Sequence, residues 1–84
     1  MSQQTLIAQQ VYMERVEPSE NVQRFYALAV WPDLFGGYSL VREWGRIGGG
    51  STMTLTQQAD AATALRKLQQ AVAVKERRGY TEIA

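Results

Sequence analysis

The sequence contains no cysteine and no histidine, and each absence removes a class of chemistry. Without cysteine the chain can form neither a disulfide nor a thiolate site. Without histidine it lacks the commonest general base and the commonest zinc ligand. Its acidic residues are scattered singly, so no pair of carboxylates is placed for acid–base catalysis. We therefore predict that the protein is not an enzyme and that it binds no metal and no cofactor.

Long apolar runs are absent as well. No stretch approaches the roughly 18–20 residues that a membrane-spanning helix needs. The N-terminal sequence MSQQTLIAQQVYM has no charged segment and no cleavage pattern, so it is not a secretory signal. We expect a cytoplasmic protein with no membrane partner.

A strong excess of either charge is also missing, because nine Lys and Arg residues stand against eight Asp and Glu residues. The resulting net charge of +1 does not by itself indicate a nucleic-acid-binding protein. The distribution is less even: residues 1–39 carry two basic and four acidic side chains, and residues 40–84 carry seven and four. An ordinary charged surface explains this polarity equally well.

Four segments have the composition and alternation of β-strands. They lie near residues 10–16, 22–31, 38–47 and 51–56, and turn-forming residues separate them. The segment 22–31 is apolar on both faces, which predicts a central strand with at least partial cover on each side. Phe25 and Trp31 are accordingly expected in the core. In the loop 33–37, Leu34 and Phe35 are expected to fold over the sheet edge, with an exposed protein contact as the alternative.

The sequence period changes to that of a helix over about residues 58–78. Thr56 is the expected N-cap and Gly79 the expected stop. Residues 80–83 are expected to add a short edge strand or to pack back on the sheet. The chain of 84 residues has room for one domain with a modest core. We therefore predict a single α+β domain, a small antiparallel sheet with one C-terminal helix packed on one face.

The most informative segment is the strand that contains Arg42, Trp44 and Arg46. Their spacing of two places all three side chains on one face of a strand. Arginine offers a planar fork to phosphate, and tryptophan offers a broad face to a base or sugar. Gly45 between them permits a bulge or a close backbone approach. In the alternative interpretation, Trp44 fills the core and the arginines are merely solvated.

A second basic group lies at the end of the predicted helix. Lys75, Arg77 and Arg78 favour the helix C-terminus electrostatically, which is the simpler interpretation of the cluster. If phosphate contacts lie nearby on the sheet, these side chains extend them.

The sequence resembles the WGR domain family, named for the tripeptide found here as Trp44-Gly45-Arg46. The segment YSLVREWGRIG at 38–48 resembles the family's signature strand and turn, and the strand near Phe25-Tyr26 resembles its aromatic strand. The helix end near Lys75, followed by Arg78-Gly79-Tyr80, resembles the family's closing segment. The resemblance covers roughly residues 22–81 and is strongest to bacterial stand-alone members, so we expect the chain to be the domain alone.

The resemblance implies a sheet with a helix on one side. In poly(ADP-ribose) polymerases such domains grip DNA near a strand break, which implies that Trp44 packs on a terminal nucleotide and Arg46 supports contacts between domains. ADP-ribosylation is not implied, since the chain carries no catalytic domain. The first hypothesis is a non-catalytic module that binds DNA, with a preference for DNA ends. The alternative is a protein–protein interaction module of a regulatory protein. The candidate binding residues are Trp44, Gly45, Arg46, Arg42, Lys75, Arg77 and Arg78.

Overall fold

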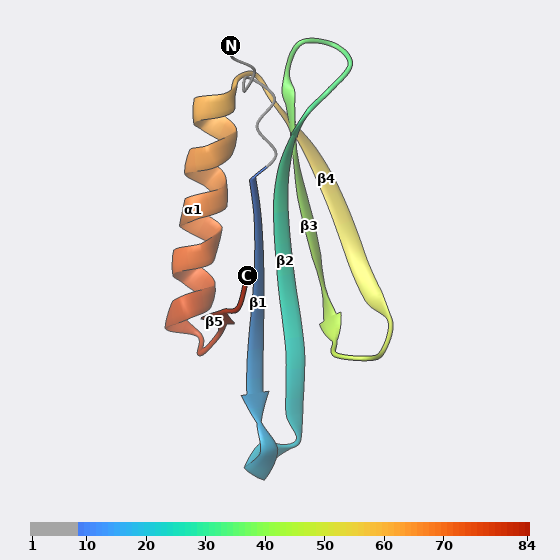
Figure 1. Cartoon of the computed structure of the whole chain (residues 1–84), viewed down its shortest axis with the longest axis vertical. Helices are drawn as coiled ribbons and strands as arrows, with labels where there is room; N and C mark the ends of the chain where they lie inside the picture. The colour runs from blue at the N-terminus through green and yellow to red at the C-terminus, as the bar shows by residue number, and fades with distance from the viewer. Residues whose placement is uncertain (1–8) are drawn as a thin grey trace.

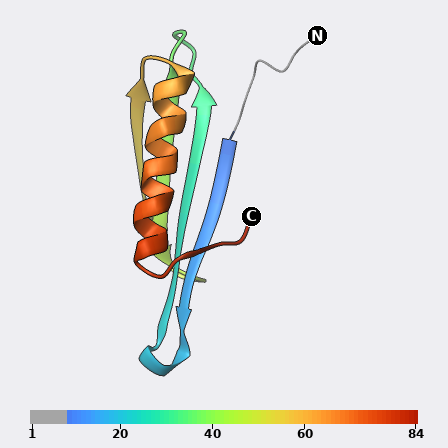
Figure 2. The same cartoon turned by 90° about the vertical axis from the view of Figure 1, so that its left-hand side faces the viewer.

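The computed structural model describes residues 9–84. Their elements in chain order are β1 (Gln9–Glu17), a 3₁₀ turn η1 (Pro18–Glu20), β2 (Val22–Pro32), β3 (Tyr38–Arg46), β4 (Ser51–Gln58), α1 (Ala61–Arg77) and β5 (Thr81–Glu82). The strands form one antiparallel sheet in the order β4-β3-β2-β1-β5. Figures 1 and 2 show α1 lying along one face of this sheet, so the predicted α+β fold is confirmed.

The helix begins at Ala61, and the expected N-cap Thr56 is wrong. Thr56 belongs to β4 and pairs with Leu40, because the strand continues to Gln58. Asp60 is the N-cap: its Oδ1 accepts a hydrogen bond of 2.7 Å from the Thr63 N–H. That bond lowers the pKa of the Asp60 carboxyl. Gly79 ends the helix as predicted, with a φ of +95° that favours glycine.

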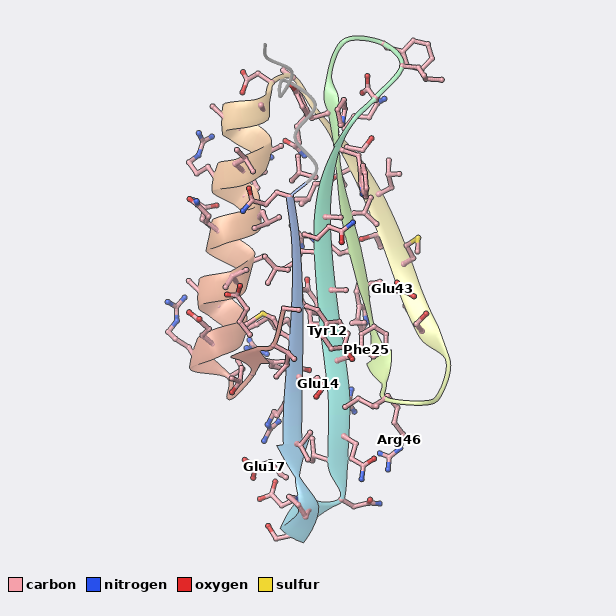
Figure 3. All side chains as sticks on the ribbon, in the orientation of Figure 1. Tyr12, Glu14, Glu17, Phe25, Glu43 and Arg46 are labelled. Atoms are coloured by element: carbon pink, nitrogen blue, oxygen red, sulfur yellow. The ribbon has the colours of Figure 1, made fainter. Side chains whose placement is uncertain are left out.

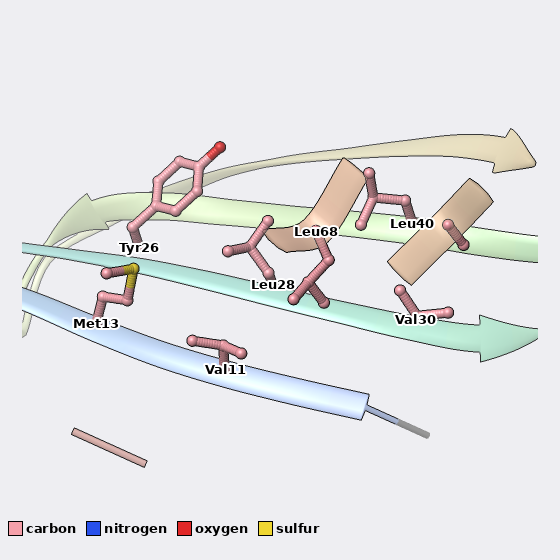
Figure 4. Packing of buried hydrophobic residues seen from close by; sticks show 8 residues of the cluster. Val11, Met13, Tyr26, Leu28, Val30, Leu40 and Leu68 are labelled. Atoms are coloured by element: carbon pink, nitrogen blue, oxygen red, sulfur yellow. The ribbon is translucent and has the colours of Figure 1, made fainter. Parts of the chain in front are cut away.

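The core lies between α1 and the sheet face that it covers (Figure 4). Alternation along β2 directs Tyr26, Leu28 and Val30 toward the helix. Half-buried apolar side chains, among them Trp44 and Tyr80, pack against this cluster. The buried members are Val11, Met13, Tyr26, Leu28, Val30, Leu40, Ala64 and Leu68.

The opposite face of the sheet, here called the open face, has no helix over it among residues 9–84. The prediction that β2 is a central strand is confirmed, but the expected cover on both sides is wrong. Trp31 is 43% exposed, and Phe25 is half-buried with its ring stacked on Tyr12 at 6.0 Å. The reason is geometric, since one helix covers only one face. Figure 3 labels Tyr12, Phe25 and Glu43, whose strand positions lie on the open face.

The loop between β2 and β3 leaves its apolar tip in solvent. Leu34 is 95% exposed and Phe35 is 86% exposed, so the expectation that they fold over the sheet edge is wrong. The Asp33 carboxylate holds the loop by accepting hydrogen bonds from the Phe35 and Gly37 N–H groups, at 2.8 and 2.9 Å. These local bonds project the tip away from the sheet.

No helix within residues 9–84 is long and apolar enough to cross a membrane.

Candidate nucleic-acid interface

The candidate interface begins with β3, whose alternate side chains lie on the helix-covered face. Leu40 is fully buried in the core, which determines the direction of Arg42 and Trp44 two and four residues later. Leu40 is the only buried residue of β3, and the partly exposed Arg42 and Trp44 follow it on the same face. The same strand therefore supplies both core and surface.

Trp44 is half-buried and stacks on Tyr26, its cross-strand partner in β2. The ring centres are 6.0 Å apart and the ring planes differ by 26°. Trp44 also lines an open hollow of about 310 Å³ together with Tyr26, Arg42, Thr54 and Lys75. The indole therefore combines the two alternatives that the sequence left open, because it packs on the core and borders solvent.

Lys75, in the last turn of α1, lies over the rings of Tyr26 and Tyr80. Its ammonium nitrogen is 4.4 Å from the centre of the Tyr26 ring and 5.3 Å from that of Tyr80. Burial is the main cause that lowers the pKa of Lys75, followed by repulsion from Arg78, Arg24 and Arg42. Each charged neighbour that shifts this pKa is thus a cation. A bound anion would relieve the repulsion.

A second and larger hollow, of about 580 Å³, continues from the first along the side of α1. Both hollows share Tyr26, Arg42 and Lys75. Among residues 9–84, none of the cations that line these hollows belongs to an ion pair. We call the combined surface the basic cleft, defined by Tyr26, Arg42, Trp44, Lys67, Lys75 and Arg78.

A row of three arginines borders the basic cleft. Arg24 of β2 pairs with Arg15 of β1 on one side and with Arg46 of β3 on the other. Residues directly opposite one another in antiparallel strands point to the same face, so this row lies beside Tyr26 and Trp44. Arg15 is the only member in an ion pair among residues 9–84, at 4.0 Å from Glu20. The sequence analysis missed Arg15 and Arg24 because they lie in the more acidic half of the chain.

Arg46 holds the turn between β1 and β2. Its two terminal nitrogens donate hydrogen bonds of 3.3 Å to the backbone oxygen and to Oδ1 of Asn21. Asn21 adopts a left-handed conformation, with a φ of 55°. The side chain of Arg46 is exposed at the end of β3 (Figure 3). Neither Arg46 nor Arg77 lines the basic cleft, whereas Arg42, Trp44, Lys75 and Arg78 do.

Gly45 has a steric function. A Cβ at this position would lie 2.3 Å from the Gly50 carbonyl oxygen and 3.0 Å from the Ser51 Cα. Any side chain would therefore push β4 away from β3. The glycine keeps the hairpin closed directly beside Trp44 and Arg46.

Comparison with known proteins gives the chain a family. Over 70 residues it is 39% identical to a protein of Sinorhizobium fredii (strain NBRC 101917 / NGR234) named "Uncharacterized protein y4dW". The match covers 83% of this chain and 34% of that protein, so the chain spans about a third of the relative's length. No solved structure matches this chain. The WGR domain model matches residues 9–84, which include all five strands and the helix. The chain therefore belongs to the WGR domain family.

Proposed function

We propose that this chain is a nucleic-acid-binding module that holds the sugar–phosphate backbone of DNA in its basic cleft. The observation that carries the proposal is the gathering of Arg42, Lys75 and Arg78 around a stacked pair of aromatic rings. Phosphate contacts from cations supply most of the affinity of such modules, and aromatic faces accept sugars and bases. Burial lowers the pKa of Lys75 most, and the further lowering by Arg78, Arg24 and Arg42 marks a concentration of positive charge that suits an anionic ligand.

The low net charge does not oppose the proposal, because no acidic side chain among residues 9–84 lines the basic cleft. Glu14 and Glu43 lie on the open face, by their pairing with Phe25 and Ala27. The basic cleft and the arginine row lie on the other face. A ligand at the cleft therefore meets a local field much more positive than +1 suggests.

A preference for DNA ends follows from the aromatic pair. A base inside a duplex is stacked on both sides, whereas the last base of a broken strand has one free face. Trp44 is the partly exposed ring of the pair and borders the hollow together with cations, so a terminal nucleotide can reach it while its phosphates contact Arg42 and Lys75. With about three to four phosphate contacts, the log–log slope of affinity against salt should lie between roughly −2.7 and −3.6.

The test is an NMR titration of the ¹⁵N-labelled chain with a blunt duplex and with a closed dumbbell that has the same stem but no ends. We expect shifts in the basic cleft with both, and tighter binding of the blunt duplex. Arg42→Gln should weaken binding by about tenfold and reduce the salt slope by about 0.9. Arg77→Gln is the matched control, because it removes the same charge outside the cleft. Shifts confined to the open face, or equal losses in the two variants, would overturn the proposal.

A second candidate function is protein binding by the open face. Met53 and Leu55 are 61% and 59% exposed on it, in addition to Trp31. A hollow of about 290 Å³ lined by Tyr12, Val41 and other open-face residues lies on the same side. Exposed apolar patches of this kind are typical of protein contacts. No DNA-induced shift in the cleft, even at low salt, would favour this second function.

A further inference from the structure

The two edges of the sheet differ in how they are protected. At the β1 edge, the C-terminal segment forms β5 and then continues along Tyr12. The Tyr12 N–H donates to the Ala84 oxygen at 2.7 Å, and the Ile83 N–H donates to the Tyr12 oxygen at 2.8 Å. At the other edge, β4 has β3 on one side and no neighbouring strand on the other among residues 9–84. Figure 1 shows β4 as this outer strand.

β4 also lacks the charged residues and prolines that usually prevent an edge strand from pairing with another strand. Its sequence, STMTLTQQ, contains no charged residue and no proline. Its residues are exposed from Ser51 to Gln57. An edge of this length and composition presents unpaired backbone groups to any strand that can approach. The composition favours an uncharged, strand-forming partner.

The sequence of β4 reads almost the same in both directions about Thr54. Thr52 and Thr56 flank it at equal distance, and so do the apolar Met53 and Leu55. We propose that β4 pairs with β4 of a second copy of this chain, antiparallel, about a two-fold axis at Thr54. In this register Met53 of one copy lies opposite Leu55 of the other, on the open face. Thr52 lies opposite Thr56 of the second copy on the helix-covered face.

Neighbouring registers are less favourable. Residues directly opposite one another in antiparallel strands point to the same face of the sheet. The two-fold axis can therefore pass through a residue but not between two residues, so neighbouring registers differ by whole residues. Centred on Met53, the pairing places Leu55 opposite Ser51. Centred on Leu55, it places Met53 opposite Gln57. Only the axis at Thr54 sets both apolar side chains of each copy against an apolar partner, and it pairs residues 51–57 along the strand.

This pairing joins two basic clefts on the same side of one continuous sheet. Arg42 lies opposite Thr54 in the β3–β4 ladder, so Arg42, Thr54 and their counterparts in the second copy form one row. Three strand spacings separate the two Arg42 positions, or about 14 Å. The inference that the two joined clefts bind one nucleic acid rests on the proposed function, whereas the dimer itself does not.

The first test is sedimentation equilibrium of the unmodified chain over a wide range of concentration, without nucleic acid. We expect the mass to double with concentration and the dimer to be insensitive to salt, because β4 carries no charge. Thr54→Lys and Thr54→Glu should each be monomeric, since like charges would meet at the axis. An equimolar mixture of the two should associate again. A chain that stays monomeric at every concentration would overturn the proposal.

Engineered cysteines test the register, because the chain has no other thiol. Oxidation should link Thr54→Cys to itself, and Thr52→Cys to Thr56→Cys in a mixture. Thr52→Cys alone should stay unlinked, because its counterpart lies about four residues away, roughly 13 Å along the strand and beyond disulfide reach. Equal linking of Thr52→Cys alone and in the mixture would overturn this register. A dimer unaffected by Thr54→Lys would instead indicate association through the open face and would also overturn the proposal.

Discussion

The ammonium nitrogen of Lys75 lies 4.4 Å from the centre of the Tyr26 ring, so the end of the helix is joined to the middle of the sheet by a cation–π contact. Tyr26 in turn stacks on Trp44. The signature strand and the helix end, 31 positions apart between Trp44 and Lys75, thus form one surface. Substitutions at this surface can separate the proposed nucleic-acid binding from domain stability.

Lys75→Met should retain the packing on Tyr26 while it removes a charge that burial and neighbouring cations disfavour. We expect a free energy of unfolding at least equal to that of the unmodified chain, together with weaker DNA binding. Denaturation and anisotropy measure the two effects. A large loss of stability would show that the cation–π contact outweighs the repulsion.

The same residue predicts a pH dependence. The pKa of Lys75 is lower in the folded chain than its usual value of 10.5, so the unfolded chain binds more protons in the window just below 10.5. The Lys75 contribution to the free energy of unfolding should therefore rise as pH increases through the lowered folded-state pKa toward 10.5. Comparison of alkaline denaturation curves isolates this rise, which should be absent from Lys75→Met. Identical pH dependence in both chains would contradict the prediction.

Trp44→Ala should reduce both stability and binding, because the ring packs against the core and borders the cleft. A fully buried tryptophan costs about 3–5 kcal/mol to remove, so we expect about 2 kcal/mol for this half-buried one. Trp44→Phe should recover most of the stability and only part of the DNA affinity. Urea denaturation and anisotropy of the three chains test the separation. An unchanged stability in Trp44→Ala would mean that the ring packs less than the structure indicates.

Gly45→Ala should destabilise the β3–β4 hairpin, because the new Cβ would meet the Gly50 carbonyl oxygen at 2.3 Å. We expect a loss of about 1–3 kcal/mol and faster amide exchange along β4. Gly50→Ala is the matched control, since a Cβ there meets nothing within 4 Å. Equal losses in the two variants would contradict the steric explanation.

Arg46→Gln should loosen the β1–β2 turn with little effect on global stability. The lost hydrogen bonds to Asn21 are exposed, so we expect about 0.5 kcal/mol. Asn21→Gly keeps the left-handed conformation accessible, removes the side chain with its Oδ1 acceptor and leaves the backbone oxygen acceptor in place. A double-mutant cycle by denaturation measures the coupling. No coupling would indicate that Arg46 is free to serve a partner instead.

Local sequence patterns were sufficient to predict four of the strands and the helix. Alternation and turn residues located the strands, and the glycine at 79 located the helix end, because both depend on neighbours in the chain. The N-cap was missed because Thr56 and Asp60 are both good caps in isolation. Pairing of β4 with β3 through Gln58 decided between them.

Alternation also grouped Phe25 with Trp31 and Tyr26 with Leu28, but it could not say which group faces the helix. Both groups are apolar, so the sequence offered no contrast between the two faces. The docking of α1 made that choice and left Trp31 in solvent.

The sequence by itself determined that Arg42, Trp44 and Arg46 share one strand face, since a period of two follows from backbone geometry. Only the tertiary structure joined Tyr26, Lys75 and Arg24 to them, and turned Arg46 toward Asn21. The physical reason is that these distances depend on the strand register and on the position of the helix over the sheet. Both result from long-range packing, which the order of residues along the chain does not display.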